Sequence, residues 1–287
     1  MGKWPALDVT HAGDPDVTLA MVDDFHPTAI EERAEAIRVF FVDANLRDAA
    51  GAALSAAKYA VRPVDVDDED WARRSQENLK PITVGRITVV PRSQPLNSNL
   101  QTLVVVIQPS MGFGTGHHAS TRLCLRGLQA VNLNDQVVLD VGTGSGELAI
   151  AAVRLGAARA LGVDYDADAI QAANENLPLN PGVDSVEFRV ADLSAADLPE
   201  ADVVTANLTG AVLVRSAVRL LDLLRPAGVL IVSGVLDEER DDVVRAFAAA
   251  GSERTRPTGD AGRVLSDPPI VWEQREDGWV ALAMKRS

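Results

Sequence analysis

The segment most informative about the fold is Val138-Leu139-Asp140-Val141-Gly142-Thr143-Gly144-Ser145-Gly146. An apolar strand enters a turn rich in glycine, and apolar residues at helical spacing follow it. Glycine adopts positive φ angles without a steric penalty and lets a ligand approach the backbone closely. The segment therefore predicts a strand, a ligand-binding turn and a helix in immediate succession.

Strands alternate with helices around this segment. Strands are predicted at 102–107, 137–141, 160–163, 186–190, 203–206 and 229–233, and helices at 120–130, 146–155, 167–176, 212–224 and 237–250. Such alternation predicts right-handed crossovers and a parallel sheet. Two further β-rich segments, 269–274 and 279–284, flank the turn signal Asp277-Gly278 and predict an antiparallel hairpin. We expect an α/β fold with a doubly wound, mostly parallel seven-stranded sheet, in the Rossmann-like layout of methyltransferases.

The polar stretch at 92–101 (RSQPLNSNLQ) is predicted to be a linker. It separates a small α+β domain at 1–91 from the α/β domain at 102–287. Within the small domain we expect strands at 16–22 and 86–90 and helices at 30–57 and 70–79. Nothing in the small domain carries identifiable chemistry.

Composition limits the class of protein. The formal charge of −14 argues against direct nucleic-acid binding, and it fits either a basic partner or simple solubility. No apolar run approaches the roughly 20 residues of a membrane span. The start of the chain lacks the pattern of a signal peptide. The single cysteine, Cys124, excludes an intramolecular disulfide. We expect a cytoplasmic monomer without a membrane partner.

The glycine spacing indicates the kind of ligand. The dinucleotide fingerprint G-x-G-x-x-G requires a third glycine at position 147, where this chain has Glu147. A carboxylate beside a pyrophosphate is unfavourable. The observed G-x-G-x-G therefore favours a ligand without phosphates, such as S-adenosylmethionine, over a nucleotide or a purely structural turn.

Acidic residues end the next two strands. Asp164 follows Gly146 by 18 residues, where a carboxylate accepts hydrogen bonds from both ribose hydroxyls. Asp192 ends the strand after that, and it either meets the adenine amine or faces water. We expect Asp140, Gly142 and Gly144 to complete the cofactor site with Gly146.

Asn207 ends the fourth strand, at the switch point of the sheet. An Asn there is placed to accept hydrogen bonds from a target amine and to aim its lone pair at the transferred methyl. Methyl transfer is an in-line displacement, so positioning supplies most of the rate. The alternative is that Asn207 caps the helix that follows it.

His117 and His118 are adjacent, and adjacent residues rarely ligate one ion. With no Cys or carboxylate pair at ligand spacing, we predict no metal site. A loop His118 contacts cofactor or substrate, or packs structurally. Cys124 lies among leucines on a predicted helix, so a buried hydrophobe is favoured over a nucleophile.

The segment Met111-Gly112-Phe113-Gly114-Thr115-Gly116-His117-His118-Ala119-Ser120-Thr121 resembles the signature of PrmA-type enzymes, which methylate ribosomal large-subunit protein eleven. Asp140–Gly146, Gly162-Val163-Asp164 and Ala206-Asn207-Leu208 also match that family, as do 68–71 and 78–81. The resemblance implies that Thr121, Gly142, Asp164 and Asn207 contact the cofactor. It places Thr115, Gly116 and His118 at the reaction mouth, with Thr115 and Gly116 in contact with the cofactor and His118 as a catalytic residue beside Asn207. It also implies a ferredoxin-like, substrate-recognising N-terminal domain.

This chain departs from the family pattern around the predicted substrate entrance. Gln108-Pro109-Ser110 replaces an acidic residue, Pro and Gly, Ala119 replaces a Pro, and the stretch 92–101 lacks the usual tryptophan. The resemblance implies methyl transfer from S-adenosylmethionine to lysine and N-terminal amines of a basic ribosomal protein. The alternatives are another protein lysine, a small-molecule amine, or a different class altogether, such as an inactive cofactor-binding module or an oxidoreductase.

Overall fold

The structure is a computed structural model, and it describes residues 3–10, 21–32, 36–67, 80–94, 101–108, 118–253 and 269–286. The described residues fall into a smaller unit that ends at 67 and a larger unit that begins at 80.

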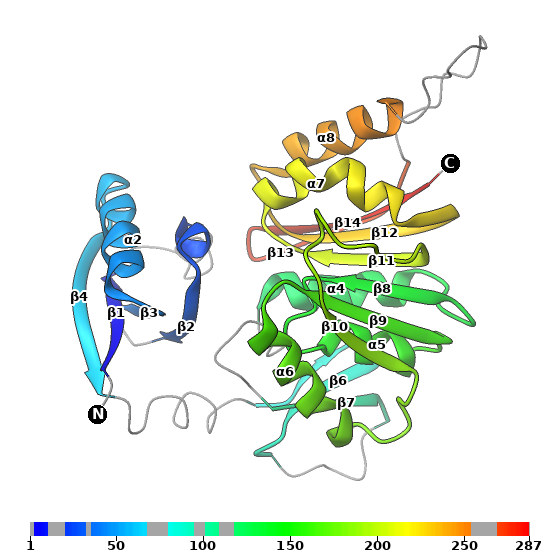
Figure 1. Cartoon of the computed structure of the whole chain (residues 1–287), viewed down its shortest axis with the longest axis horizontal. Coiled ribbons are helices and arrows are strands. Elements are labelled where there is room, and N and C mark those ends of the chain that lie inside the picture. Colours follow the sequence, from blue (N-terminus) through cyan, green and yellow to red (C-terminus); the bar gives the residue numbers. More distant parts are fainter. Residues whose placement is uncertain are drawn as a thin grey trace. The chain divides into compact units, whose positions relative to one another are not determined.

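The larger unit is built on a seven-stranded sheet (Figure 1). In chain order its strands are β8 (Val137–Val141), β9 (Arg159–Asp164), β10 (Val186–Val190), β11 (Ala201–Asn207), β12 (Leu224–Leu236), β13 (Ile270–Glu276) and β14 (Trp279–Lys285). The spatial order is β10-β9-β8-β11-β12-β14-β13. The first five strands in this order are parallel, and β14 runs antiparallel to both of its neighbours. The predicted mostly parallel sheet with a closing hairpin is confirmed.

Helices cover both faces of this sheet, so the fold is doubly wound. They are α4 (Ala119–Ala130), α5 (Glu147–Arg154), α6 (Ala167–Asn176), α7 (Gly210–Asp222) and α8 (Arg240–Glu253), with a short 3-10 turn, η2 (Leu177–Leu179), after α6. Apolar residues of α4 and α5 form one core with alternate residues of the strands. Residues of α7 and α8, which lie together in Figure 1, form the second core on the opposite face.

A separate three-stranded sheet packs into the first of these cores. It consists of β5 (Ile82–Val84), β6 (Ile87–Pro91) and β7 (Leu103–Ile107), and β6 pairs in parallel with β7. The strand predicted at 102–107 is β7, and it pairs with β6 and not with the strands of the seven-stranded sheet. Residues 82–91, assigned from sequence to the N-terminal domain, pair within the larger unit. Both β6 and β7 are almost continuously apolar, as is typical of parallel strands buried on both faces.

The smaller unit is a four-stranded antiparallel sheet with the order β2-β3-β1-β4. Its elements are β1 (Lys3–Thr10), η1 (Asp23–Phe25), β2 (Pro27–Glu32), β3 (Ile37–Phe41), α2 (Ala44–Ala56) and β4 (Ala60–Asp67). Helix α2 begins after Asp43, whose carboxylate accepts from the backbone N–H groups of Asn45 and Leu46. Leu54 of α2 is fully buried in a core with Leu7 and Val39 of the sheet.

The predicted helix at 30–57 is wrong over its first half. Residues 30–32 belong to β2 and residues 37–41 to β3, and among the described residues of this range only those of α2 are helical. Ile37, Val39 and Phe41 alternate with their neighbours, and all three are fully buried in the core that α2 covers. Burial of this face therefore outweighs the helix propensity of the Ala and Glu residues just before it. The strand predicted at 16–22 and the helix at 70–79 lie largely outside the described residues.

Candidate functional site: the carboxyl edge of the large sheet

The turn between β8 and α5 depends on its three glycines. Gly142, Gly144 and Gly146 have φ angles of 72°, 51° and 82°, in the left-handed region that other residues rarely adopt. The backbone N–H groups of Gly142 and Thr143 donate to the Val163 carbonyl of β9, at 2.9 and 3.0 Å. A Cβ at Gly142 would lie 2.5 Å from Cδ2 of Leu208. The turn therefore holds a shape that larger residues would disrupt.

Asp164 stands at the end of β9, beside this turn. Its Oδ2 accepts a hydrogen bond of 3.0 Å from the Gly144 N–H, and its Oδ1 accepts one of 3.1 Å from the Asp166 N–H. Burial raises the pKa of the Asp164 carboxyl above its usual range. Each carboxylate oxygen has a second acceptor site. The group is therefore suited to receive the two ribose hydroxyls of a nucleoside.

Two apolar side chains beside Asp164 were not identified from sequence. Tyr165 follows Asp164 and is 71% exposed, and Val190 on β10, the register partner of Asp164, is 51% exposed. Exposed apolar surface beside a carboxylate that can accept from ribose hydroxyls suits the flat base of a nucleoside. A large apolar residue directly after a strand-ending acid is the sequence signal for such a surface.

Asp192 lies just beyond β10 and is exposed. Its Oδ1 accepts from the backbone N–H of Ser194 at 2.8 Å and from its hydroxyl at 2.7 Å. These hydrogen bonds lower the pKa of the Asp192 carboxyl. Asp192 is therefore ionised at neutral pH, and its contact with adenine stays a prediction.

Asn207 and Thr121 meet, although they are 86 residues apart in the sequence. Asn207 is the last residue of β11, and its Nδ2 donates to the Oγ1 of Thr121 on α4 at 3.3 Å. The N-cap of α7 is Thr209, so the alternative that Asn207 caps this helix is not observed. Two residues predicted to contact the cofactor are thus brought together at the switch point of the sheet.

His118 is the N-cap of α4. Its Nδ1 accepts from the backbone N–H of Ser120 at 3.3 Å and lies 2.7 Å from the Ser120 hydroxyl. The imidazole also meets the ring of Trp279 edge to face, with centroids 4.7 Å apart. His118 is thus held in place by α4 and β14. Thr115 and Gly116, predicted to line the reaction mouth, lie outside the described residues.

Asp140 lies beneath the turn, where it is fully buried. Its carboxylate accepts from the hydroxyls of Thr143, at 2.6 Å, and Thr205, at 2.5 Å. Burial raises the pKa of Asp140 to about 6, and the two hydroxyls oppose that rise. The predicted direct contact of Asp140 with the cofactor is untested. In the described structure one oxygen accepts from the turn and the other from β11, so Asp140 ties the turn to the neighbouring strand.

Glu147, the first residue of α5, is only 1% exposed, and neither carboxylate oxygen has a hydrogen-bond partner in the described structure. Burial, with Asp140 nearby, raises the pKa of Glu147 to about 8. Cys124 of α4 is also fully buried, and burial raises the pKa of its thiol. The prediction of a buried, unreactive cysteine agrees with this position. The unusual acidity of Glu147 was not apparent from sequence.

The fold and the site define the class. A doubly wound sheet with a closing antiparallel hairpin, a glycine turn without the dinucleotide spacing, and Asp164 on the adjacent strand are the parts of an S-adenosylmethionine-dependent methyltransferase. Among the described residues, no helix is long and apolar enough to cross a membrane.

Comparison with known proteins gives the family. Residues 19–256 match the model of the family described as ribosomal protein L11 methyltransferase (PrmA). A protein of that name from Pelobacter propionicus is 39% identical over 79% of this chain and 70% of its own length. Another from Geobacter sulfurreducens is 43% identical over 65% of this chain and 61% of its own. This chain belongs to the PrmA family.

A solved structure supports the fold assignment. The ribosomal protein L11 methylase from Lactobacillus delbrueckii subsp. bulgaricus superposes with a TM-score of 0.61 and 26% sequence identity. The match covers 73% of this chain and 98% of that one.

Proposed function

We propose that this protein transfers methyl groups from S-adenosylmethionine to amino groups of ribosomal protein L11, on lysine side chains and the N-terminal amine. The observation that carries the proposal is the Asn207–Thr121 pair at the end of β11, beside the glycine turn and Asp164. The relatives described above bear the name of the L11 enzyme. The aligned region spans 70% of the length of one relative and 61% of the other, so L11 as the substrate of this chain is part of the proposal.

Each part of the site has a separate task in this reaction. The glycine turn and Asp164 hold the nucleoside, with Tyr165 and Val190 providing apolar surface for its base. When bound, S-adenosylmethionine supplies a methyl group on a cationic sulfur. The Asn207 amide oxygen accepts a hydrogen bond from the attacking amine and so fixes the direction of its lone pair. The rate then comes mainly from alignment of nitrogen, carbon and sulfur.

The amine has to lose its proton before it attacks. Transfer of a lysine from water to a partly apolar site beside a cation lowers its pKa, so a neutral amine forms without a strong protein base. The net charge of −14 raises the encounter rate with a basic protein and disfavours a nucleic-acid substrate. We also propose that the enzyme acts in the cytoplasm, as a ribosomal substrate would require, and that it acts as a monomer.

The test uses labelled S-adenosylmethionine with purified L11 and the full chain. We expect label on L11 with the wild-type enzyme and at least a tenfold lower rate with Asn207→Ala. Binding of S-adenosylhomocysteine without any label on L11 would refute the substrate and leave the cofactor assignment intact.

A second candidate is another amine, on a different protein or a small molecule. It is motivated by the entrance residues Gln108-Pro109-Ser110 and Ala119, which depart from the family pattern. Label that appears in a small-molecule extract and not in the protein fraction would favour it. Binding of NAD in place of S-adenosylhomocysteine would favour an oxidoreductase, and full occupancy without transfer to any acceptor would favour a non-catalytic binder.

A further inference from the structure

One buried side-chain amide joins the glycine turn to a strand of a different sheet. Asn176, the last residue of α6, has no exposed surface. Its Nδ2 donates to the Ser145 carbonyl at 2.9 Å, and its Oδ1 accepts from the Gln108 N–H at 2.7 Å. Ser145 lies between two of the turn glycines, and Gln108 directly follows β7. The amide thus spans two segments that no strand pairing connects.

The Ser145 carbonyl needs such support because of the turn around it. Gly144 and Gly146, on either side, have left-handed φ angles, and an unrestrained glycine loses much conformational entropy when it adopts one state. Ser145 is itself 2% exposed, so bulk solvent has little access to this carbonyl. The adjacent Gly144 N–H is the donor to Asp164 Oδ2. A rotation of the Ser145–Gly146 peptide would break the 2.9 Å hydrogen bond from the Gly146 N–H to the Thr143 carbonyl, and would so alter the turn that carries the Gly144 donor.

Asn180 provides an internal comparison one helical turn further on. It is 1% exposed, and its amide accepts from the Val106 N–H at 2.8 Å and donates to the Val106 carbonyl at 2.7 Å. It also donates to the Asn176 carbonyl at 2.9 Å. Asn180 therefore anchors β7 in the same manner as Asn176, but none of its bonds reaches the turn.

We propose that Asn176 is a positioning residue for cofactor binding: through the Ser145 carbonyl it holds the glycine turn in the conformation that receives S-adenosylmethionine. The proposal rests on the assignment of the turn as the cofactor site. It does not depend on the identity of the methyl acceptor. Loss of the Asn176 side-chain amide should therefore weaken cofactor binding as well as lower the stability of the protein.

The experiment compares Asn176→Ala with the matched control Asn180→Ala in the full-length protein. Both variants lose buried hydrogen bonds, so we expect both to melt at lower temperatures. Calorimetry with S-adenosylhomocysteine, carried out well below those melting temperatures, should give a Kd raised roughly three- to tenfold for Asn176→Ala, the equivalent of one hydrogen bond. For Asn180→Ala the Kd should stay within about twofold of the wild-type value, because its bonds end at β7.

Kinetics provide the readout that a general structural role would not change. We expect Asn176→Ala to raise the KM for S-adenosylmethionine while kcat at saturating cofactor stays close to the wild-type value. Equal changes in Kd for the two variants, or an unchanged Kd for Asn176→Ala, would overturn the proposal.

Asn176→Asp covers the case in which the alanine variant does not fold. It is isosteric and keeps an acceptor for Gln108, but when ionised it has no donor for the Ser145 carbonyl. It should also raise the Kd, whereas a wild-type Kd for a folded Asn176→Asp at pH 8 would contradict the inference. A wild-type protein that binds S-adenosylhomocysteine yet does not methylate L11 would refute the proposed substrate and leave this inference standing.

Discussion

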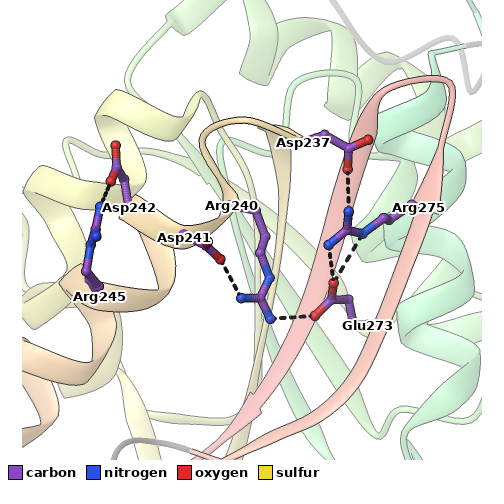
Figure 2. A network of polar contacts seen from close by, with 7 residues as sticks. All are labelled: Asp237, Arg240, Asp241, Asp242, Arg245, Glu273 and Arg275. Atoms are coloured by element: carbon purple, nitrogen blue, oxygen red, sulfur yellow. Dashed lines mark hydrogen bonds and ion pairs between the residues drawn. The ribbon is translucent and has the colours of Figure 1, made fainter.

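Two groups of acidic residues in the larger unit differ in their burial and in whether an arginine pairs with them. The turn-side acids, Asp140, Glu147 and Asp164, have no arginine or lysine partner in the part of the chain that the structure describes, and burial raises the pKa of all three. The hairpin-side network in Figure 2 consists of Asp237, Arg240, Asp241, Asp242, Arg245, Glu273 and Arg275.

In the hairpin-side network every carboxylate has an arginine. Arg240 donates to Asp241 and Glu273, both at 2.7 Å, and these contacts lower the pKa of both acids. Charge is thus neutralised by arginine at α8 and β13, whereas near the glycine turn burial keeps Glu147 protonated below its pKa of about 8. The difference suits a site whose ligand itself brings a positive sulfur and hydroxyl donors. We therefore expect the buried acids near the turn to affect the free energy of unfolding more than the partly exposed ion pairs near the hairpin do.

The largest expected effect concerns Glu147. Its pKa is raised from 4.5 to about 8, so between these values the unfolded chain is ionised while the folded protein keeps the proton. The stability that this group contributes is complete below pH 4.5 and is lost as the pH rises to 8. The stability advantage of Glu147→Leu should therefore grow by about 1.4 kcal/mol per pH unit, or about 4 kcal/mol from pH 5 to pH 8. Urea unfolding at several pH values measures it.

The control is Glu187→Leu, because Glu187 is an exposed carboxylate on β10. The pH dependence that Glu147→Leu shows should exceed that of this exposed-site control. A pH-independent difference for Glu147→Leu would show that burial does not raise the pKa of Glu147. The contrast between buried acids and arginine-paired acids would then be wrong.

Next in size is the effect of Asp164→Ala on cofactor binding. Loss of a carboxylate that serves both ribose hydroxyls should weaken S-adenosylhomocysteine binding at least about 100-fold, since hydrogen bonds to charged groups are worth about 1.5–3 kcal/mol each. The same change in the other region, Asp241→Ala, should leave the affinity unchanged. Calorimetry on both proteins gives the answer, and similar affinities for the two variants would contradict the role assigned to Asp164.

Asn207→Ala should have a smaller effect, confined to turnover. We expect roughly a ten- to thirtyfold lower kcat, because a misaligned amine loses part of the advantage of positioning. The Kd for S-adenosylhomocysteine should change by less than about threefold, because this amide is assigned to the amine. Parallel kinetics and calorimetry separate the two quantities. An equal loss of affinity and turnover would assign Asn207 to the cofactor alone.

The smallest effect belongs to the hairpin-side network. Glu273→Gln should reduce the free energy of unfolding by less than about 1 kcal/mol, because partly exposed ion pairs are screened by water. The difference should disappear in 1 M salt, where the Debye length is about 3 Å. A loss of several kcal/mol that persists at high salt would show that this network affects the free energy of unfolding as much as the buried acids do.

Much of the larger unit could be predicted from sequence because its pattern is local. The strands 137–141 and 186–190 and the helix 167–176 were predicted with the boundaries that the structure has. The pairing of β7 with β6 could not be predicted, since an apolar five-residue strand does not specify its partner. Residues 30–32 and 37–41 were misassigned because their burial depends on a sheet that includes strands distant in sequence.

The site shows the same limit. Spacing and strand ends identified the glycine turn, Asp164 and Asn207, and the pairing of Asn207 with Thr121 fits that placement. Asn176 was overlooked because an asparagine near the end of a helix has no distinguishing pattern. Its importance lies in two backbone groups that are distant in sequence. Glu147 was considered only as a missing glycine, and its burial is a property of the packed core.

The place of β14 in the sheet has a consequence for synthesis. This strand lies between β12 and β13, and Trp279 to Met284 are almost completely buried, although they are made after every other strand of that sheet. While the chain grows, β12 presents an open hydrogen-bonding edge to its surroundings. Such edges invite pairing with foreign strands. We therefore expect nascent chains that stall before residue 279 to depend on chaperones and to aggregate without them.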